Sequence, residues 1–146
     1  MSTLLEQATV AGAMVRYPKT CSPRTTVRQA RTVFEDGHVH ALLVVDRGLL
    51  LAVVERGDLV DRPADMPVRW LGTLRGRTVS PETELAGVRE AMHAAGRRRI
   101  AVVDENGHLL GLLCLKRSGR GFCSDDGIRA RAAERRDRPA GADRHG

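Results

Sequence analysis

The chain has 146 residues, a formal net charge of +6 and an isoelectric point near 10.2, and this length holds one ordinary domain or two small units that share a core. Aromatic residues make up only 3% of the sequence, which excludes a stacked aromatic platform for single-stranded nucleic acid. No apolar run is long enough to cross a bilayer, and no signal or transit sequence is recognisable. We therefore expect a cytoplasmic protein whose three cysteines are reduced.

The first predicted element is a helix that follows the turn sequence Ser22-Pro23. Apolar residues recur at helical spacing from Val27 to Phe34, which predicts an amphipathic helix. Thr25 is the expected N-cap, because a threonine hydroxyl can accept a hydrogen bond from a free amide of the first turn. Gly37 is expected to end the helix, since glycine tolerates the left-handed conformation that often follows a last turn.

Two short apolar runs follow, LLVVD at 42–46 and LLAVV at 50–54. Runs of this length without polar interruption are typical of strands that are buried on both faces. Arg47-Gly48 lies between them and predicts a hairpin turn. A short helix is expected to begin near Asp58.

The chain then repeats these signals after a shift of 58 residues. TCSPRTTV at 20–27 aligns with TVSPETEL at 78–85, and the tripeptide VVD recurs at 44–46 and 102–104. An internal repeat of this length indicates one supersecondary unit that is duplicated in tandem.

The second unit has matching elements. They are a helix over Leu85–Met92 with Thr83 as its N-cap and Gly96 at its end, and a hairpin turn at Asn106-Gly107. A sheet this small is marginal alone, so we expect the two units to bury their sheets on each other. The expected division of the chain is a first unit at 8–62, a linker at 63–67, a second unit at 68–118 and a basic C-terminal segment at 119–146.

The C-terminal segment carries helix signals of its own. Ser124 precedes two aspartates, and the stretch up to Arg136 is rich in Ala and Arg, so its charges would complement a helix dipole. We interpret it as a helix followed by a flexible tail beyond Pro139. A basic helix could contact nucleic acid or an acidic protein, but a solubilising, docking helix is the simpler interpretation.

The order of motifs in each unit is a TxSPxT turn, a helix, an hhVVD strand, a turn and an LLGhh strand. It resembles the cystathionine-beta-synthase (CBS) domain, here in two tandem copies from about Val10 to Ser118. The resemblance implies an α/β (α+β) fold in which two β-α-β-β-α units pack with pseudo-twofold symmetry, an arrangement called a Bateman module. It also implies clefts that bind adenosine-containing ligands such as AMP, ATP or S-adenosylmethionine, and dimerisation through the helices.

In the first unit, the family pattern of a Ser or Thr followed three residues later by Asp falls on Glu55 and Asp58. Asp58, at a strand-to-helix junction, could accept both ribose hydroxyls, and the helix N-terminus would favour a phosphate. Glu55 departs from the pattern, because a carboxylate repels a nearby phosphate. The simpler alternative is that Asp58 only caps its helix. The other ligand-binding candidates of this cleft are His40, Ala41, Val79 and Ser80.

One extra residue in the second hairpin turn moves the shift to 59, so in the second unit the same pattern falls on Cys114 and Arg117, and a cation replaces the ribose anchor. The candidates for phosphate binding are all basic, namely Arg97, Arg98, Arg99, Lys116 and Arg117. The alternative is that these are ordinary surface residues. The residues assigned to the second cleft are Cys21, Ser22 and Cys114.

No pattern for a metal site or for catalysis is present. The histidines and cysteines match no zinc-ligand spacing. A phosphate-binding P-loop, a Ser-His-Asp pattern and a helix with paired carboxylates are all missing. We therefore expect no metal, no cofactor and no enzyme activity.

The favoured hypothesis is a stand-alone regulatory CBS pair that senses an adenosine-type ligand and signals to a partner protein, without membrane contact. The alternative is a basic scaffold with empty clefts, in which Arg97 to Arg99 and the tail bind nucleic acid or an acidic protein. The repeat helices carry more apolar residues than we expect the two sheets to cover. A homodimer is therefore also expected, with Phe34 and Met92 near the centre of its interface.

Overall fold

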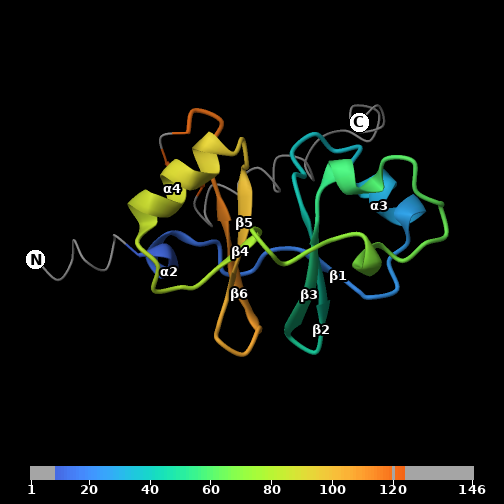
Figure 1. The fold of residues 1–146 in the computed structure, drawn as a ribbon, viewed down its shortest axis with the longest axis horizontal. Helices are drawn as coiled ribbons and strands as arrows, with labels where there is room; N and C mark the ends of the chain where they lie inside the picture. Colours follow the sequence, from blue (N-terminus) through green and yellow to red (C-terminus); the bar gives the residue numbers. More distant parts are fainter. Residues whose placement is uncertain (1–8, 120, 124–146) are drawn as a thin grey trace, which may run out of the picture.

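The computed structural model describes residues 9–119 and 121–123, which contain two three-stranded sheets that lie side by side (Figure 1). The strands of the first sheet are β1 (Thr20–Cys21), β2 (Leu42–Asp46) and β3 (Leu49–Val54). Those of the second are β4 (Thr78–Val79), β5 (Arg99–Val103) and β6 (Leu109–Cys114). In each sheet the short first strand pairs in parallel with the second, and the second pairs antiparallel with the third.

The pairing register repeats together with the sequence. Thr20 lies opposite Leu43 in the first sheet, and Thr78 lies opposite Ala101 in the second. The antiparallel ladder has an irregularity after Val44, and the same irregularity follows Val102. The predicted tandem repeat and α+β architecture are therefore confirmed in three dimensions.

The helices lie on the outer faces of the sheets, α3 (Val27–Val33) on the first and α4 (Leu85–Ala94) on the second (Figure 1). The N-cap of α3 is Thr26, whose hydroxyl accepts a hydrogen bond from the Gln29 N–H at 3.2 Å. The predicted caps Thr25 and Thr83 were wrong by one residue. The Thr25 N–H closes the preceding turn on the Ser22 carbonyl at 3.1 Å, so the helix begins one residue later.

The second helix has the same offset, since its N-cap is Glu84 and the Thr83 N–H bonds to the Ser80 carbonyl at 3.2 Å. At its other end Gly96 follows the C-cap with a φ of +67°, which confirms the predicted stop. Gly37 was a wrong prediction, because α3 is already capped at Phe34 and Gly37 is not left-handed. Successive reverse turns after Val33 end that helix.

The segment that precedes each unit packs against the other unit. The helix α2 (Val10–Ala13) lies beside β4–β6 (Figure 1), and the Val10 N–H donates to the Thr83 carbonyl at 3.0 Å. The equivalent 3-10 helix Val68–Trp70 packs on the first unit, where the Val68 N–H donates to the Thr25 carbonyl at 2.9 Å. Each packed unit thus draws on two separate stretches of chain.

Three apolar clusters form the interior. One lies between α3 and the first sheet, one between α4 and the second sheet, and a third, which includes Leu43 and Ala101, joins the two sheets. The predicted sheet-to-sheet packing is therefore present. The hairpin tips also pair, since the Leu50 N–H donates to the Gly107 carbonyl at 3.0 Å.

The two largest apolar side chains of the repeat helices are buried, although Val33 of α3 is 42% exposed. Phe34 is 4% exposed and Met92 is 2% exposed, each inside its own unit. The argument that these two residues centre a dimer interface was therefore wrong, because the cores within the chain already cover them. The homodimer itself stays a prediction.

Within the described residues, the short helix that closes each predicted unit is present only in the first. It is the 3-10 helix Arg56–Leu59. Among residues 115–119 and 121–123 there is no second such helix, and Leu115 forms an antiparallel bridge with Phe122 instead. The expected tail helix after Ser124 lies outside the described residues. In the described part of the chain, no helix combines the length and apolar character that a bilayer crossing requires.

Candidate functional site

A cluster of four charged side chains joins the two units where β3 ends. Arg77, just before β4, contacts Asp58 through both guanidinium nitrogens, at 2.6 and 3.3 Å, and also donates to the Val53 carbonyl at 2.8 Å. Its Nη2 lies 3.2 Å from Glu55. The side chains of Arg77 and Asp58 are only 12% and 19% exposed. The two hydrogen bonds compensate the charges of this largely buried pair. Removal of either partner would leave the other as an uncompensated charge.

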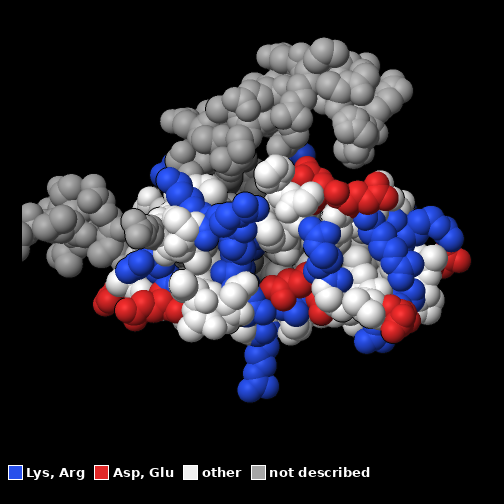
Figure 2. Space-filling model, turned by 90° about the horizontal axis from the view of Figure 1, so that it is seen from above, with Lys and Arg blue, Asp and Glu red and all other residues white. Residues whose placement is uncertain are grey.

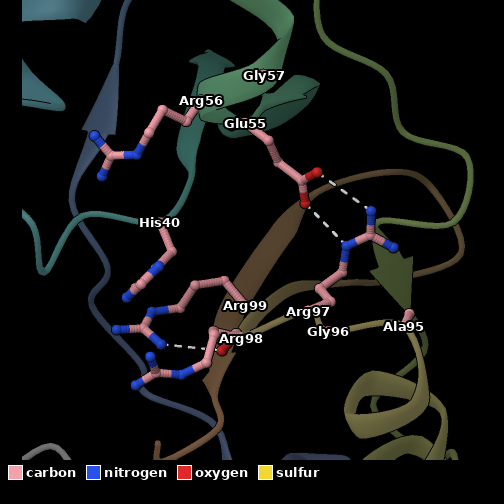
Figure 3. A pocket seen from close by; sticks show the side chains of 9 residues that line it. All are labelled: His40, Glu55, Arg56, Gly57, Ala95, Gly96, Arg97, Arg98 and Arg99. Atoms are coloured by element: carbon pink, nitrogen blue, oxygen red, sulfur yellow. Dashed lines mark hydrogen bonds and ion pairs between the residues drawn. The ribbon is translucent and has the colours of Figure 1, made fainter.

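Arg97 completes the cluster from the second unit. Its Nε and Nη2 donate to the two carboxylate oxygens of Glu55 at 2.9 and 3.2 Å, a bidentate pair (Figure 3). Its Nη1 donates to the Gly76 carbonyl at 3.0 Å. The hydrogen bond to Glu55 raises the pKa of the Arg97 guanidinium further above its usual value. Glu55, the departure from the family pattern, is thus neutralised by two arginines.

Next to this cluster is a cavity of about 240 Å³ that both units line. Its walls come from the loops that precede β2 and β5 and from the start of the 3-10 helix Arg56–Leu59. The lining residues are His40, Glu55, Arg56, Gly57, Ala95, Gly96, Arg97, Arg98 and Arg99. We call this cavity the basic pocket.

Three of these side chains converge in the basic pocket. The side chains of His40, Arg98 and Arg99 lie together, on the side away from Glu55 and Arg97 (Figure 3). Arg98 is anchored through its Nε, which donates to the Leu115 carbonyl at 3.0 Å. Arg99 donates from Nη1 to the Arg98 carbonyl at 3.0 Å.

The charged groups that lower the pKa of His40 are all basic. Burial is the largest cause, and together with Arg99, Arg98, Arg56 and His38 it lowers the pKa of His40 to about 4. His40 is therefore neutral at physiological pH. The guanidinium groups repel one another, and an anion that entered the pocket would reduce this repulsion.

Arg56 borders the basic pocket but is engaged elsewhere. Its guanidinium donates to the carbonyls of Phe34 and Val39, the latter at 2.7 Å, and lies 4.9 Å from the centroid of the Phe34 ring. These contacts fix the end of α3 to the 3-10 helix. Arg56 therefore supports the pocket wall.

The structure brings only part of the predicted site together. His40, Glu55 and Arg97 to Arg99 line one pocket, and Asp58 joins them through Arg77. Ala41, Val79 and Ser80 are not among the lining residues. Val79 packs against the core of the second unit, and Ser80 donates its hydroxyl hydrogen to Glu82.

The residues predicted for a second cleft do not gather in an equivalent pocket. Cys21 packs against the core of the first unit, and the Ser22 hydroxyl accepts a hydrogen bond from the Arg24 N–H at 3.2 Å. Cys114 is buried at the end of β6. The side chains of Lys116 and Arg117 are exposed and do not line the basic pocket.

Sequence reasoning missed Arg77, which contacts both carboxylates of the cluster. One signal could have found it, because Arg77 aligns with Lys19 in the repeat and each directly precedes the first strand of its sheet. Lys19 is exposed, so of these two aligned residues only Arg77 joins the charged cluster. The difference follows from Asp58, which has no carboxylate counterpart at Arg117 in the second unit.

The remaining charges do not form one basic surface. Seen from above, Lys and Arg side chains alternate with Asp and Glu across the molecule (Figure 2). Arg97 is directed at Glu55 rather than outward. The described residues therefore offer no continuous positive stripe on this face, which is the feature that the scaffold hypothesis needs. No group of three or more His, Cys, Asp or Glu in the described ranges could hold a metal ion.

Comparison with known proteins gives a consistent family assignment. A family model for the CBS domain matches residues 10–65 and 77–117. No curated protein matches the sequence. The CBS pair domain of a putative Mg²⁺ transporter from Shewanella oneidensis is 22% identical with a TM-score of 0.65, and the alignment covers 86% of this chain and 72% of that chain.

Two similar structures contain a nucleotide. CBSX2 in complex with AMP is 24% identical with a TM-score of 0.62, over 86% of this chain and 97% of that chain. The cytosolic domain of the Mg²⁺ channel MgtE in complex with ATP is 21% identical with a TM-score of 0.61, over 75% of this chain. The chain spans only 46% of that domain. At these identities the similarity establishes the fold.

Proposed function

The chain belongs to the CBS-domain family and carries two copies of the domain, and on this premise we propose that it is a regulatory module that binds an adenosine nucleotide and signals to a partner protein. The observation that carries the proposal is the convergence of His40, Arg98 and Arg99 in a pocket between the copies. The ATP and AMP complexes of two proteins of the same fold support it.

The phosphate groups of the ligand supply most of the affinity in this proposal. Guanidinium groups bind phosphate through paired, charge-assisted hydrogen bonds. The basic pocket, at about 240 Å³, is smaller than the roughly 300–1,000 Å³ of cavities that enclose a whole drug-sized ligand. It suits a phosphate chain, with the nucleoside outside it.

The ribose contributes less, because its expected anchor is already occupied. Asp58 accepts two hydrogen bonds from Arg77 and a third from the Glu55 N–H at 2.7 Å. A ribose that used Asp58 would have to displace part of this network. Ligands with two or three phosphates should therefore bind more tightly than AMP, and adenosine should bind weakly.

Signalling would use the position of the pocket between the copies. His40 and Glu55 come from the first copy and Arg97 to Arg99 from the second. An anion that contacts both sides favours one relative orientation of the copies. A partner that binds this orientation would therefore bind more tightly when the ligand is present. The proposal requires only that the partner protein distinguishes the two orientations.

Isothermal titration calorimetry with ATP, ADP, AMP, adenosine and S-adenosylmethionine tests the proposal. We expect ATP and ADP to bind at least about tenfold more tightly than adenosine, a difference of about 1.4 kcal/mol. Ligand binding should also raise the melting temperature by mass action. Absence of heat and of a melting shift for every ligand at millimolar concentration would refute it.

Matched variants locate the site. Arg98→Ala with Arg99→Ala should abolish the preference for ATP over adenosine, because the two guanidinium groups that lie together with His40 are lost. Arg28→Ala removes an exposed arginine of α3, whose carboxylate partner Asp65 is exposed too, and should leave ATP affinity unchanged. Equal weakening by both changes would indicate a general charge effect and would contradict a site in the basic pocket.

A further inference from the structure

Two cysteines outside the basic pocket lie opposite each other on neighbouring backbone segments. After β6 the chain turns back on itself, and Leu115 and Phe122 form an antiparallel bridge. One residue further from the turn, the Cys123 N–H donates to the Cys114 carbonyl at 2.7 Å. This register places Cys114 directly opposite Cys123.

The backbone geometry of such a pair is compatible with a disulfide. Residues in an antiparallel, hydrogen-bonded position have Cα atoms about 5.5 Å apart, and their side chains lie on the same face. Disulfides in proteins span Cα separations of about 4.4–6.8 Å. Neither residue is in a disulfide here, and the Cα separation typical of such a position lies inside that range.

The three cysteines differ in their surroundings. Cys114 is 2% exposed and Cys123 is half-buried, so an oxidant from solution reaches Cys123 first. Cys21 packs against the core of the first unit, and burial raises the pKa of its thiol. A raised thiol pKa lowers the fraction of reactive thiolate, which makes Cys21 the internal control.

We propose that Cys114 and Cys123 are a redox-sensitive thiol pair that hydrogen peroxide converts into an intramolecular disulfide. The Cys123 thiolate attacks one peroxide oxygen and breaks the O–O bond, which gives a sulfenic acid and, with the thiol proton, one water. The Cys114 thiol then attacks the sulfenic sulfur, forms the S–S bond and releases a second water. The two thiols lose two electrons and two protons in total, and the peroxide is reduced to two waters.

The pair lies beside an arginine of the basic pocket. Leu115, adjacent to Cys114, donates from its N–H to the Arg98 carbonyl at 2.8 Å and accepts from the Arg98 Nε at 3.0 Å. A disulfide would fix residues 121–123 against the end of β6, next to this anchor. The modification site and the pocket are therefore connected through one residue.

Peptide mapping of the full-length chain tests the proposal. The protein is treated with hydrogen peroxide, remaining thiols are blocked with N-ethylmaleimide, and the sample is digested with trypsin without reductant. Trypsin cleaves after Lys116, Arg117 and Arg120, so the two cysteines separate unless they are bonded. We expect mass spectrometry to find Ile100–Lys116 linked to Gly121–Arg129, with loss of the linked peptide after dithiothreitol and an alkylated Cys21.

Single substitutions separate this pair from other disulfides. Cys21→Ser should leave the linked peptide at its wild-type yield, whereas Cys123→Ser should remove it while the circular dichroism spectrum stays unchanged. Three alkylated thiols after peroxide treatment would overturn the proposal. A linked peptide that contains Cys21, or a disulfide-bonded dimer as the main product, would overturn it as well.

Discussion

Replacement of Arg77 by methionine should destabilise the fold far more than loss of any exposed arginine. Methionine keeps much of the apolar stem and removes the guanidinium group. Asp58 then loses two hydrogen bonds, at 2.6 and 3.3 Å, and the Val53 carbonyl loses its 2.8 Å donor. Asp58 is left as a charged group that is only 19% exposed.

The magnitude follows from this shielding. Removal of one partner from a buried ion pair costs about 3–5 kcal/mol. Asp58 keeps its hydrogen bond from the Glu55 N–H, and Glu55 keeps Arg97, so we expect a loss at or just below the low end of that range, about 2–3 kcal/mol. For a domain of this size the melting temperature should fall by about 8–12 °C.

Urea denaturation followed by circular dichroism measures the effect, and a double-mutant cycle assigns it to the pair. The double variant Arg77→Met, Asp58→Asn should recover at least about 1 kcal/mol of the loss, because the unpaired carboxylate is gone. The control Arg28→Met breaks the Arg28–Asp65 pair, whose side chains are 68% and 86% exposed, and should change stability by less than about 0.5 kcal/mol. Equal losses for Arg77→Met and Arg28→Met would refute the reasoning.

Three further predictions concern the basic pocket, the packing of the segment after α2 on the second unit, and the core. The pKa of His40 is about 4 in the fold against an ordinary 6.5, so the unfolded chain takes up the proton first as pH falls and stability is lost between these values. The loss has an upper bound of about 3 kcal/mol, and screening reduces it to about 1–2 kcal/mol. It should be absent from the stability–pH curve of His40→Gln and appear as the difference between the two proteins, and identical curves would contradict it. Gly111→Ala places a Cβ 2.6 Å from the Val15 carbonyl oxygen and should cost about 1–3 kcal/mol in urea, whereas Gly87→Ala in α4 meets nothing within 4 Å and should stabilise by about 0.5–1 kcal/mol. Phe34→Ala should cost about 3–5 kcal/mol because Phe34 is 4% exposed. Light scattering should show that the folded variant has the same assembly state as the wild type. A folded variant with a different assembly state would restore Phe34 as a residue of the dimer interface.

Much of the fold could be predicted because its signals are local. The shift of 58 residues between copies, the apolar strand runs and the glycine turns each depend on residues that are neighbours in sequence. Arg47 and Gly48 have φ values of +53° and +84°, and Gly107 has +87°, as hairpin turns require. Gly96 ends α4 for the same kind of local reason.

The candidate site could be predicted only in part, because its contacts join distant residues. The Arg97–99 run and Glu55 were found as motifs, but their pairing across 42 positions and the part played by Arg77 were not. Cys114 and Cys123 likewise match no cysteine motif, and only the register of the chain after β6 places them opposite each other.

The sequence by itself determined that there are two copies of one unit and what each copy contains, because turn chemistry and apolar periodicity act over a few residues. Only the tertiary structure decided that α2 packs on the second unit and Val68–Trp70 on the first. It also decided that Phe34 and Met92 face the interior. Helical periodicity shows which residues share a face, but the surface that covers this face depends on packing between segments that are remote in the chain.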